Sequence, residues 1–163
     1  MNMKRTAIIV FSIIVIAIVI WGLLGKIKIV DNKPAIALAD SYFDELQHSR
    51  IEEAYSSYSE EIKSQNGENW KKLLTGLDKQ FGAVTSKSLT GMSVVPVAEV
   101  GCWLLSYNVN RTLYVSEDRM IVCPSNDKGL IASNIVGYEM RRADTGQTIS
   151  VGLTLTESKI SAP

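Results

Sequence analysis

Histidine and cysteine are scarce in this chain, which holds one histidine, His48, and two cysteines, Cys102 and Cys123, among 163 residues. One histidine excludes a metal site built from several histidines, and these three side chains cannot supply the four ligands of a structural zinc site without carboxylates. The formal net charge is zero, so no basic excess points to nucleic acid. We expect no metal, no cofactor and no nucleic-acid partner.

The motifs of common enzyme classes are also missing. The sequence has no glycine-rich phosphate loop of the G-x-G-x-x-G type and no C-x-x-C redox motif. No Ser-His-Asp arrangement is indicated, because no motif surrounds His48, the only histidine. We therefore assign no catalytic residue and expect a protein that is not an enzyme.

What the chain does have is a long apolar run near its start. Residues 7–25 carry no charge, and Ser12 is their only polar side chain. A helix needs about 20 such residues to cross a bilayer, and Trp21 stands near one end, where indole favours the headgroup level. We predict a short basic tail at 1–6, a transmembrane helix at 7–25 and a juxtamembrane linker at 26–34.

Three other interpretations of this run are weaker. A buried helix of a soluble protein is seldom apolar on every side. A cleaved signal peptide has an apolar stretch of about 7–15 residues, and the nearest small-x-small site, at 37–39, lies well past the run. The run resembles a type IV pilin helix, but that helix carries an early glutamate, and no acid precedes Asp31. We favour a retained anchor.

Basic residues flank the run on both sides. Lys4 and Arg5 precede it, and Lys26, Lys28 and Lys33 follow it, so the preference of basic residues for the cytoplasmic side is nearly balanced. A short basic tail before a first span usually stays inside. We expect a single-pass protein of the cell inner membrane that contacts lipid through residues 7–25 and holds its C-terminal domain in the periplasm or otherwise outside the cytoplasm.

Helical periodicity begins after the linker. Pro34 suits the first turn of a helix, because its missing N–H would be unpaired there. Apolar residues then recur at helical spacing through 35–48. His48 stands at the end of this helix, where its ring can interact with the last carbonyl groups. The expected role of His48 is therefore helix capping rather than catalysis.

Two further helices are predicted before the chain changes character. Ser49 and Glu52 form an S-x-x-E capping box, which predicts a short helix from Arg50. A third helix is expected to open near Asn66. Gly82 closes it, because glycine adopts the left-handed backbone conformation that often ends helices.

From Ala83 the apolar pattern alternates with a period of two, which is typical of strands. We expect strands at 84–95, 100–110, 114–123, 130–140 and 149–155, with turns at 125–129 and 144–147. The predicted fold class is α+β: two to three helices packed on a curved antiparallel sheet of four to five strands. This domain spans 35–157, and residues 158–163 form a C-terminal tail.

The two cysteines fall on neighbouring predicted strands. If the numbers of facing residues add to 225, Cys102 faces Cys123, and Trp103 faces Val122 on the other side. Facing Cβ atoms lie about 4.5–5.5 Å apart, so a disulfide needs only a small approach. We favour a structural disulfide in an oxidising compartment. Two reduced, half-buried cysteines and a redox-active pair are the alternatives.

Helices followed by a meandering sheet resemble the cone-shaped fold of the nuclear transport factor two and ketosteroid isomerase superfamily. The stretch WKKLL…FGAVTSKSL, 70–89, is similar to the passage from the third helix into the first strand of small exported bacterial members. DKGLIASNIVGYEM, 127–140, resembles their penultimate passage, although Leu130 follows Gly129 where those passages often read Gly-x-Trp. The resemblance covers about 35–140, and a strand after 145 departs from the shortest members.

The resemblance implies a cone lined by aromatic side chains. The candidates for that lining are Tyr42, Tyr55, Trp70, Phe81, Trp103 and Tyr107. In the isomerase branch, an aspartate base and tyrosine or acid donors line the cone. Asp40, Asp44 and Asp118 are present but match no isomerase motif, and Asp40 and Asp44 are expected on a solvated helix face.

An anchor joined to a domain without a catalytic set indicates a binding or assembly role. Bitopic inner-membrane subunits of type IV secretion systems are similar in layout. We therefore expect a non-enzymatic domain outside the cytoplasm that binds a partner protein or a second copy of itself. The first alternative is a small-ligand binder or isomerase-like enzyme that uses the cone pocket, and the second is a pilus-like subunit.

Overall fold

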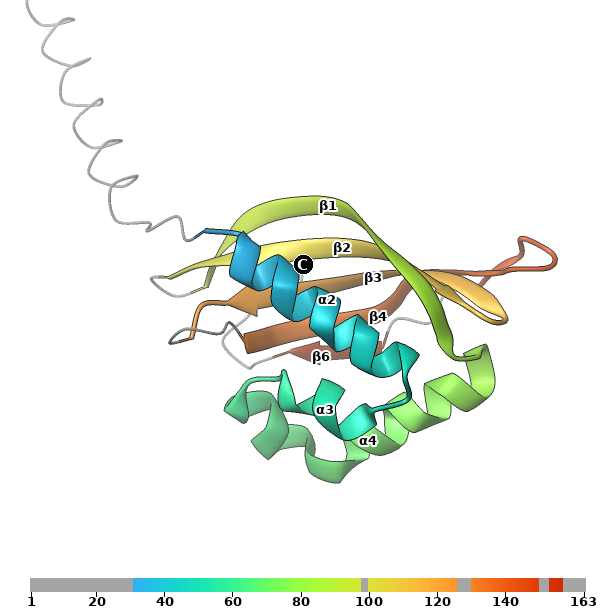
Figure 1. The fold of residues 1–163 in the computed structure, drawn as a ribbon, viewed down its shortest axis with the longest axis horizontal. Helices are drawn as coiled ribbons and strands as arrows, with labels where there is room; N and C mark the ends of the chain where they lie inside the picture. Colours follow the sequence, from blue (N-terminus) through green and yellow to red (C-terminus); the bar gives the residue numbers. More distant parts are fainter. Residues whose placement is uncertain (1–30, 98–99, 126–129, 150–152, 157–163) are drawn as a thin grey trace, which may run out of the picture.

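The computed structural model describes residues 31–97, 100–125, 130–149 and 153–156. Three helices come first (Figure 1): α2, Lys33–Gln47; α3, Ile51–Ser56; and α4, Glu60–Phe81. Six strands follow: β1, Val84–Val97; β2, Val100–Arg111; β3, Tyr114–Cys123; β4, Leu130–Arg142; β5, Thr148–Ile149; and β6, Leu153–Thr156. The α+β class is confirmed.

The predicted membrane segments lie outside the described residues. They include the tail at 1–6, the helix at 7–25 and residues 26–30 of the linker, and the C-terminal tail at 158–163 lies outside as well. The end of the predicted linker is described and differs from the prediction, because α2 already begins at Lys33. Among the helices that the structure does describe, none has the length and apolar content needed to cross a bilayer.

All strands pair antiparallel in the order β1-β2-β3-β4-β5, and β6 also pairs with β4. The sheet bends strongly around the helices, with α2 across its face and α3 and α4 beneath (Figure 1). The expected four to five strands are thus six in the structure. The single strand predicted at 149–155 is two strands, β5 and β6, because each pairs with a different part of β4.

The predicted register of β2 and β3 is confirmed. Trp103 lies opposite Val122, and Leu105 lies opposite Met120, so facing numbers add to 225. Leu105, Met120 and Val122 are buried towards the helices. This face carries one continuous core to which all three helices contribute, because alternate residues of each strand point the same way.

The turn between α2 and α3 differs from the predicted capping box. Ser49 has a φ of 56°, and no side chain caps α3, whose N-cap residue is Arg50. Instead, Ser49 N donates to the carbonyl of Leu46, and Arg50 N donates to that of Glu45. This is a Schellman ending of α2, and it takes Ser49 in the left-handed conformation. The capping-box prediction is therefore wrong, because Ser49 takes part in the C-terminal ending of α2 and does not cap α3.

His48 contacts the end of α2 as predicted. Its Nδ1 lies 2.7 Å from the carbonyl oxygen of Asp44.

The predicted start of the third helix is wrong by about one and a half turns. Helix α4 begins at Glu60, where the Ser59 side chain accepts a hydrogen bond from Ile62 N. Gly67, with a φ of 48°, interrupts the helix, so the periodicity that predicted a start near Asn66 belongs to its second segment.

Gly82 to alanine should destabilise the domain by about 1–3 kcal/mol, the usual cost of a strained backbone position. Gly82 has a φ of 84°, and a Cβ there would lie 2.7 Å from the Thr112 Cβ. Gly76, inside α4, has no neighbour within 4 Å of an added Cβ. Gly76 to alanine should instead stabilise by up to about 1 kcal/mol. Denaturant unfolding measures the change in the free energy of unfolding for both variants. A change of the same sign in both would contradict the prediction.

Candidate functional site

A cluster of polar side chains lies inside the core, between the helices and the sheet. We call Tyr42, Tyr58, Arg111, Asp118 and Asn134 the interior polar cluster. Each is no more than 4% exposed. They come from α2, the turn before α4, and strands β2, β3 and β4, so the cluster joins both layers of the fold.

Two tyrosines and an asparagine form one end of the cluster. The Tyr58 hydroxyl donates to the Tyr42 hydroxyl at 3.0 Å. Asn134 Nδ2 donates to Tyr42 at 3.1 Å and to Tyr58 at 2.6 Å. Tyr58 is held in place by a short bridge to β4, in which Ile131 N donates to the Ser57 carbonyl. Burial raises the pKa of Tyr42 to about 12 and that of Tyr58 well above its usual value.

Asp118 forms the other end of the cluster. Strand β4 bulges opposite it, since Arg119 faces Ile135 while Glu117 faces Glu139. The bulge places Gly137, at a φ of 68°, so that its N–H donates to Asp118 Oδ1 at 2.9 Å. Burial raises the pKa of Asp118, and Arg111 offsets part of that rise.

Arg111 stands between two carboxylates. Its Nη2 lies 3.9 Å from Asp118 Oδ2, and its Nη1 lies 3.6 Å from Asp78 Oδ1 on α4. Both distances exceed those of a close charge-assisted hydrogen bond. Burial raises the pKa of Asp78, and Arg111 lowers it in part. A buried cation thus neutralises charge on both layers, and the arrangement fits a structural role.

Among the residues that the structure describes, four buried side-chain polar atoms have no hydrogen-bond partner: Trp70 Nε1, Arg111 Nε, Ser116 Oγ and Asn134 Oδ1. Hydrogen bonding by Trp70 and Ser116 nevertheless offsets part of the rise in the pKa values of Tyr58 and Asp118. This leaves Arg111 Nε and Asn134 Oδ1 without a partner. Buried polar atoms usually find a partner, commonly an enclosed water.

The pKa of Asp118 predicts a pH dependence. Because burial raises this pKa above its ordinary value of 3.8, the folded state binds the proton more tightly than the unfolded state. The contribution of Asp118 to stability is therefore complete below the unfolded pKa and is lost as pH rises through the folded pKa. The stability of wild type relative to Asp118→Asn should fall over that window, by about 1.4 kcal/mol per unit of pKa difference.

Asp144 supplies the control of opposite sign. The hydrogen bond from Arg142 lowers the pKa of Asp144, so its contribution is present above the unfolded pKa and is lost as pH falls. Denaturant unfolding at a series of pH values compares Asp118→Asn and Asp144→Asn with wild type. If the stability difference from wild type changed with pH in the same direction for both variants, the raised pKa of Asp118 would be contradicted.

The residues predicted to line a cone come together, but as core. Tyr42, Trp70, Phe81 and Tyr107 are at most 3% exposed. The Trp70 ring meets Tyr58 edge-on at 5.8 Å, and Phe81 meets Tyr114 at 5.0 Å. Tyr55 and Trp103 are half-buried against the same core. These aromatic rings fill the space between the layers.

The two cysteines and the aspartates of α2 lie outside the interior polar cluster. A disulfide joins Cys102 and Cys123, whose Cα atoms lie 4.4 Å apart. It lies on the sheet face away from the helices, beside Val97 and Ile121. Asp40 and Asp44 do not stand on a purely solvated face, because Lys87 Nζ lies 2.9 and 3.1 Å from their carboxylates.

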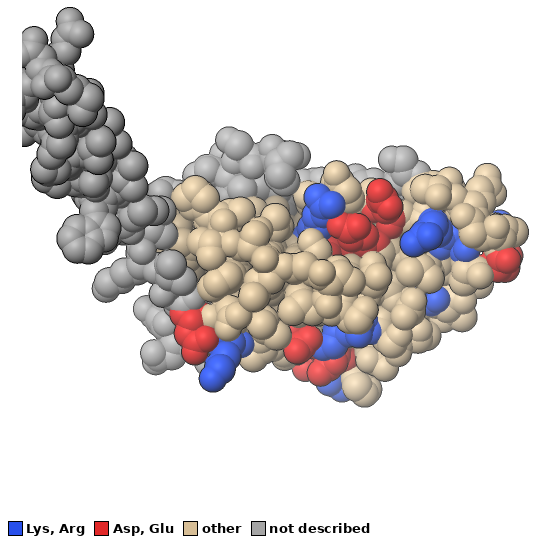
Figure 2. Space-filling view, turned by 90° about the horizontal axis from the view of Figure 1, so that it is seen from above, with Lys and Arg blue, Asp and Glu red and all other residues tan. Residues whose placement is uncertain are grey.

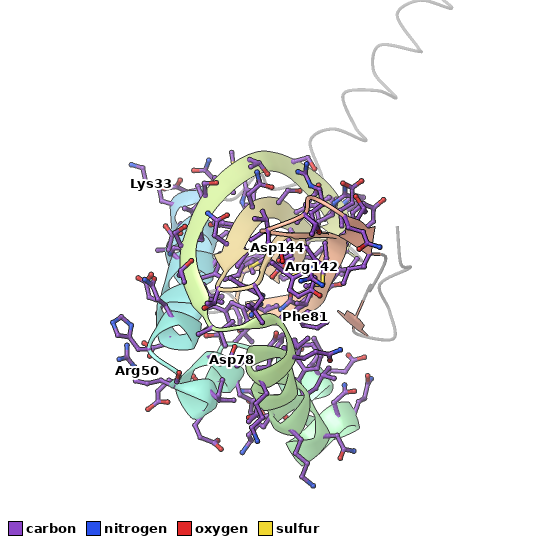
Figure 3. All side chains as sticks on the ribbon, turned by 90° about the vertical axis from the view of Figure 1, so that its right-hand side faces the viewer. Lys33, Arg50, Asp78, Phe81, Arg142 and Asp144 are labelled. Atoms are coloured by element: carbon purple, nitrogen blue, oxygen red, sulfur yellow. A yellow bond between two sulfur atoms is a disulfide. The ribbon has the colours of Figure 1, made fainter. Side chains whose placement is uncertain are left out.

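One shallow groove of about 270 Å³ lies at the end of the sheet that holds the β2–β3 turn. Arg142 pairs there with Asp144 at 2.8 Å, and Figure 3 shows the two next to each other near Phe81. The groove is lined by Gln80, Thr112, Leu113, Tyr114, Arg142, Ala143 and Asp144. In the part of the chain that the structure describes, no three His, Cys, Asp or Glu side chains gather to hold a metal.

Comparison with known proteins gives no match: no family model, curated protein or solved structure matches this chain. The likeness to the nuclear transport factor two and ketosteroid isomerase superfamily therefore stays a prediction. What the chain does must be argued from its own residues.

Proposed function

We propose that this chain is a single-pass membrane-anchored, non-enzymatic domain that serves binding or assembly outside the cytoplasm. The Cys102–Cys123 disulfide carries the proposal, because such bonds persist in oxidising compartments. The uncharged run at 7–25 supplies an anchor of the right length. The cone-like architecture that we expect of the domain is supported by three helices against a bent antiparallel sheet.

Enclosure of the polar groups supports the non-enzymatic part of the proposal. The groups with raised pKa at the centre of the fold, Tyr42, Tyr58 and Asp118, are at most 1% exposed. A substrate would have to open the core to reach them. Their partners are mainly one another, so their burial serves the fold, and a partner protein or a second copy would meet the outer surface.

Topology and anchoring are tested together in intact cells. Alkaline phosphatase fused after Pro163 should be active, since it folds only outside the cytoplasm, whereas green fluorescent protein fused there should stay dark. Ile16→Lys should release the chain on carbonate extraction, because a charge at the centre of a span is costly, while Ile16→Leu should stay in the membrane. Crosslinking in those membranes should give a defined adduct. A bright green fusion, or a chain that is monomeric and gives no adduct with any partner, would overturn the proposal.

A second candidate function is the binding of a small polar ligand inside the domain. Arg111 Nε and Asn134 Oδ1, buried without partners, favour it. Enclosed water is the simpler occupant. A ligand that paired with Asn134 Oδ1 should raise the melting temperature of wild type and leave that of Asn134→Leu unchanged. A panel of small hydrogen-bonding compounds that shifts neither protein would remove this candidate.

A further inference from the structure

An apolar strip is exposed on the edge strand β1. Leu89, Met92 and Val94 are 40%, 43% and 40% exposed, and we call them the β1 strip. They face Tyr107, Leu105 and Trp103 of β2, respectively. The strip therefore lies on the helix side of the sheet and extends the core to the outside. Figure 2 shows a broad uncharged surface in this region, beside the end where the described chain begins.

Helix α2 runs antiparallel alongside β1. Gln47 Nε2 donates to the Thr85 carbonyl at 3.0 Å, at one end of the helix. At the other end, Asn32 Nδ2 contacts Met92 Sδ at 3.4 Å. The chain therefore enters the domain directly beside the middle of the strip. Leu89 and Val94 lie three and two residues from Met92, which is about 10 Å or less along a strand.

The length of chain before the domain fixes how far the strip can be from the apolar run. The run ends at Gly25, and the described residues begin at Asp31. Six residues span at most about 20 Å when fully extended. If residues 7–25 cross the bilayer, the headgroup layer of about 5–8 Å takes up part of that length. The strip is then held within reach of the lipid surface at a high effective concentration.

We propose that the β1 strip rests on the membrane surface and inserts Leu89, Met92 and Val94 among the lipid headgroups. This inference rests on the proposed anchoring by residues 7–25. A lipid surface suits the strip better than a second copy of the chain, because three partly exposed side chains offer far less area than the roughly 800 Å² per partner of a stable dimer. Contact with lipid also fixes the orientation of the domain and leaves its other surfaces free for a partner.

Single added cysteines on the full chain, reconstituted in vesicles of zwitterionic and anionic phospholipid, test the proposal. The native cysteines are joined to each other, so only the added thiol takes an NBD label. Met92→Cys reports the strip. Ser93→Cys is the matched control, since the exposed Ser93 is the next residue of β1 but points to the opposite face of the sheet. A lipid with a spin label near its headgroup quenches any NBD group that it meets.

Quenching at position 92 should be at least threefold that at position 93. Equal quenching at both positions would overturn the proposal, because closeness to the tether would then explain it. An intermolecular disulfide through the cysteine at 92 before labelling would also overturn it, since a second copy would occupy the strip. Carbonate extraction distinguishes anchoring by residues 7–25 from lipid contact of the β1 strip. Release of the chain would contradict both. Retention of the chain without the difference in quenching would contradict lipid contact of the strip alone.

Discussion

Replacing Arg111 by methionine should destabilise the domain by about 3–5 kcal/mol, the usual result of leaving a buried charge without its partner. Arg111 is 4% exposed and stands between Asp118 and Asp78. Methionine keeps an unbranched chain that still packs, so the loss reports the charge more than a cavity. Denaturant unfolding of the full chain in mild detergent, followed by near-UV circular dichroism, measures the change.

Three comparisons sharpen this test. Arg141→Met, at an exposed position, should change stability by less than about 0.5 kcal/mol. The double variant Arg111→Met with Asp118→Asn should recover much of the loss, because the carboxylate that lost its partner is gone. The loss in the single variant should also shrink at low pH, where Asp118 is protonated. A loss below about 1 kcal/mol, or no recovery in the double variant, would show that Arg111 does not neutralise the interior.

Local pattern was enough to predict most of the sheet. Alternation placed β2 and β3 to within one residue. The register that pairs the two cysteines was favoured because it also puts Leu105 opposite Met120 on one apolar face, as the structure shows. Pattern failed where a neighbouring element decides the outcome. The sequence pattern predicts Ser49 as an N-cap residue, but Ser49 adopts the left-handed conformation that ends α2. The strand at 149–155 reads as continuous, but β4 pairs with two separate parts of it.

Most of the interior polar cluster could not be predicted from the sequence. Tyr58, Arg111 and Asn134 belong to no motif. Asn134 contacts two tyrosines that are distant in the sequence, Tyr58 at a separation of 76 positions and Tyr42 at a separation of 92. Some signals were present. The register that pairs the cysteines also places Asp118 opposite Tyr107 on the core face. Continuing the alternation of β2 past Val109 puts Arg111 there too. Only the tertiary fold shows that the cation and the carboxylate meet.

Replacing both cysteines by alanine should cost about 3 kcal/mol of stability. The Cys102–Cys123 bond closes a loop with a sequence separation of 21. Loop-closure entropy in the unfolded chain gives about 3 kcal/mol for a loop of this size. Cys102 is also 1% exposed and packs with Val97 and Ile121, so loss of the sulfur removes some packing as well. Unfolding of the double alanine variant and of the oxidised wild type, without reductant, measures the difference.

Reduction of the wild type separates the bond from the packing. Reduced wild type keeps both sulfur atoms and should lose most of the 3 kcal/mol, while the double alanine variant should respond to reductant with no change. Leu104 packs beside the disulfide on the same face, and Leu104→Ala is the matched packing control that keeps the bond. If reduction of the wild type left its stability unchanged, the bond would not constrain the unfolded chain. The oxidising compartment that we propose for the domain would then lose its strongest physical reason.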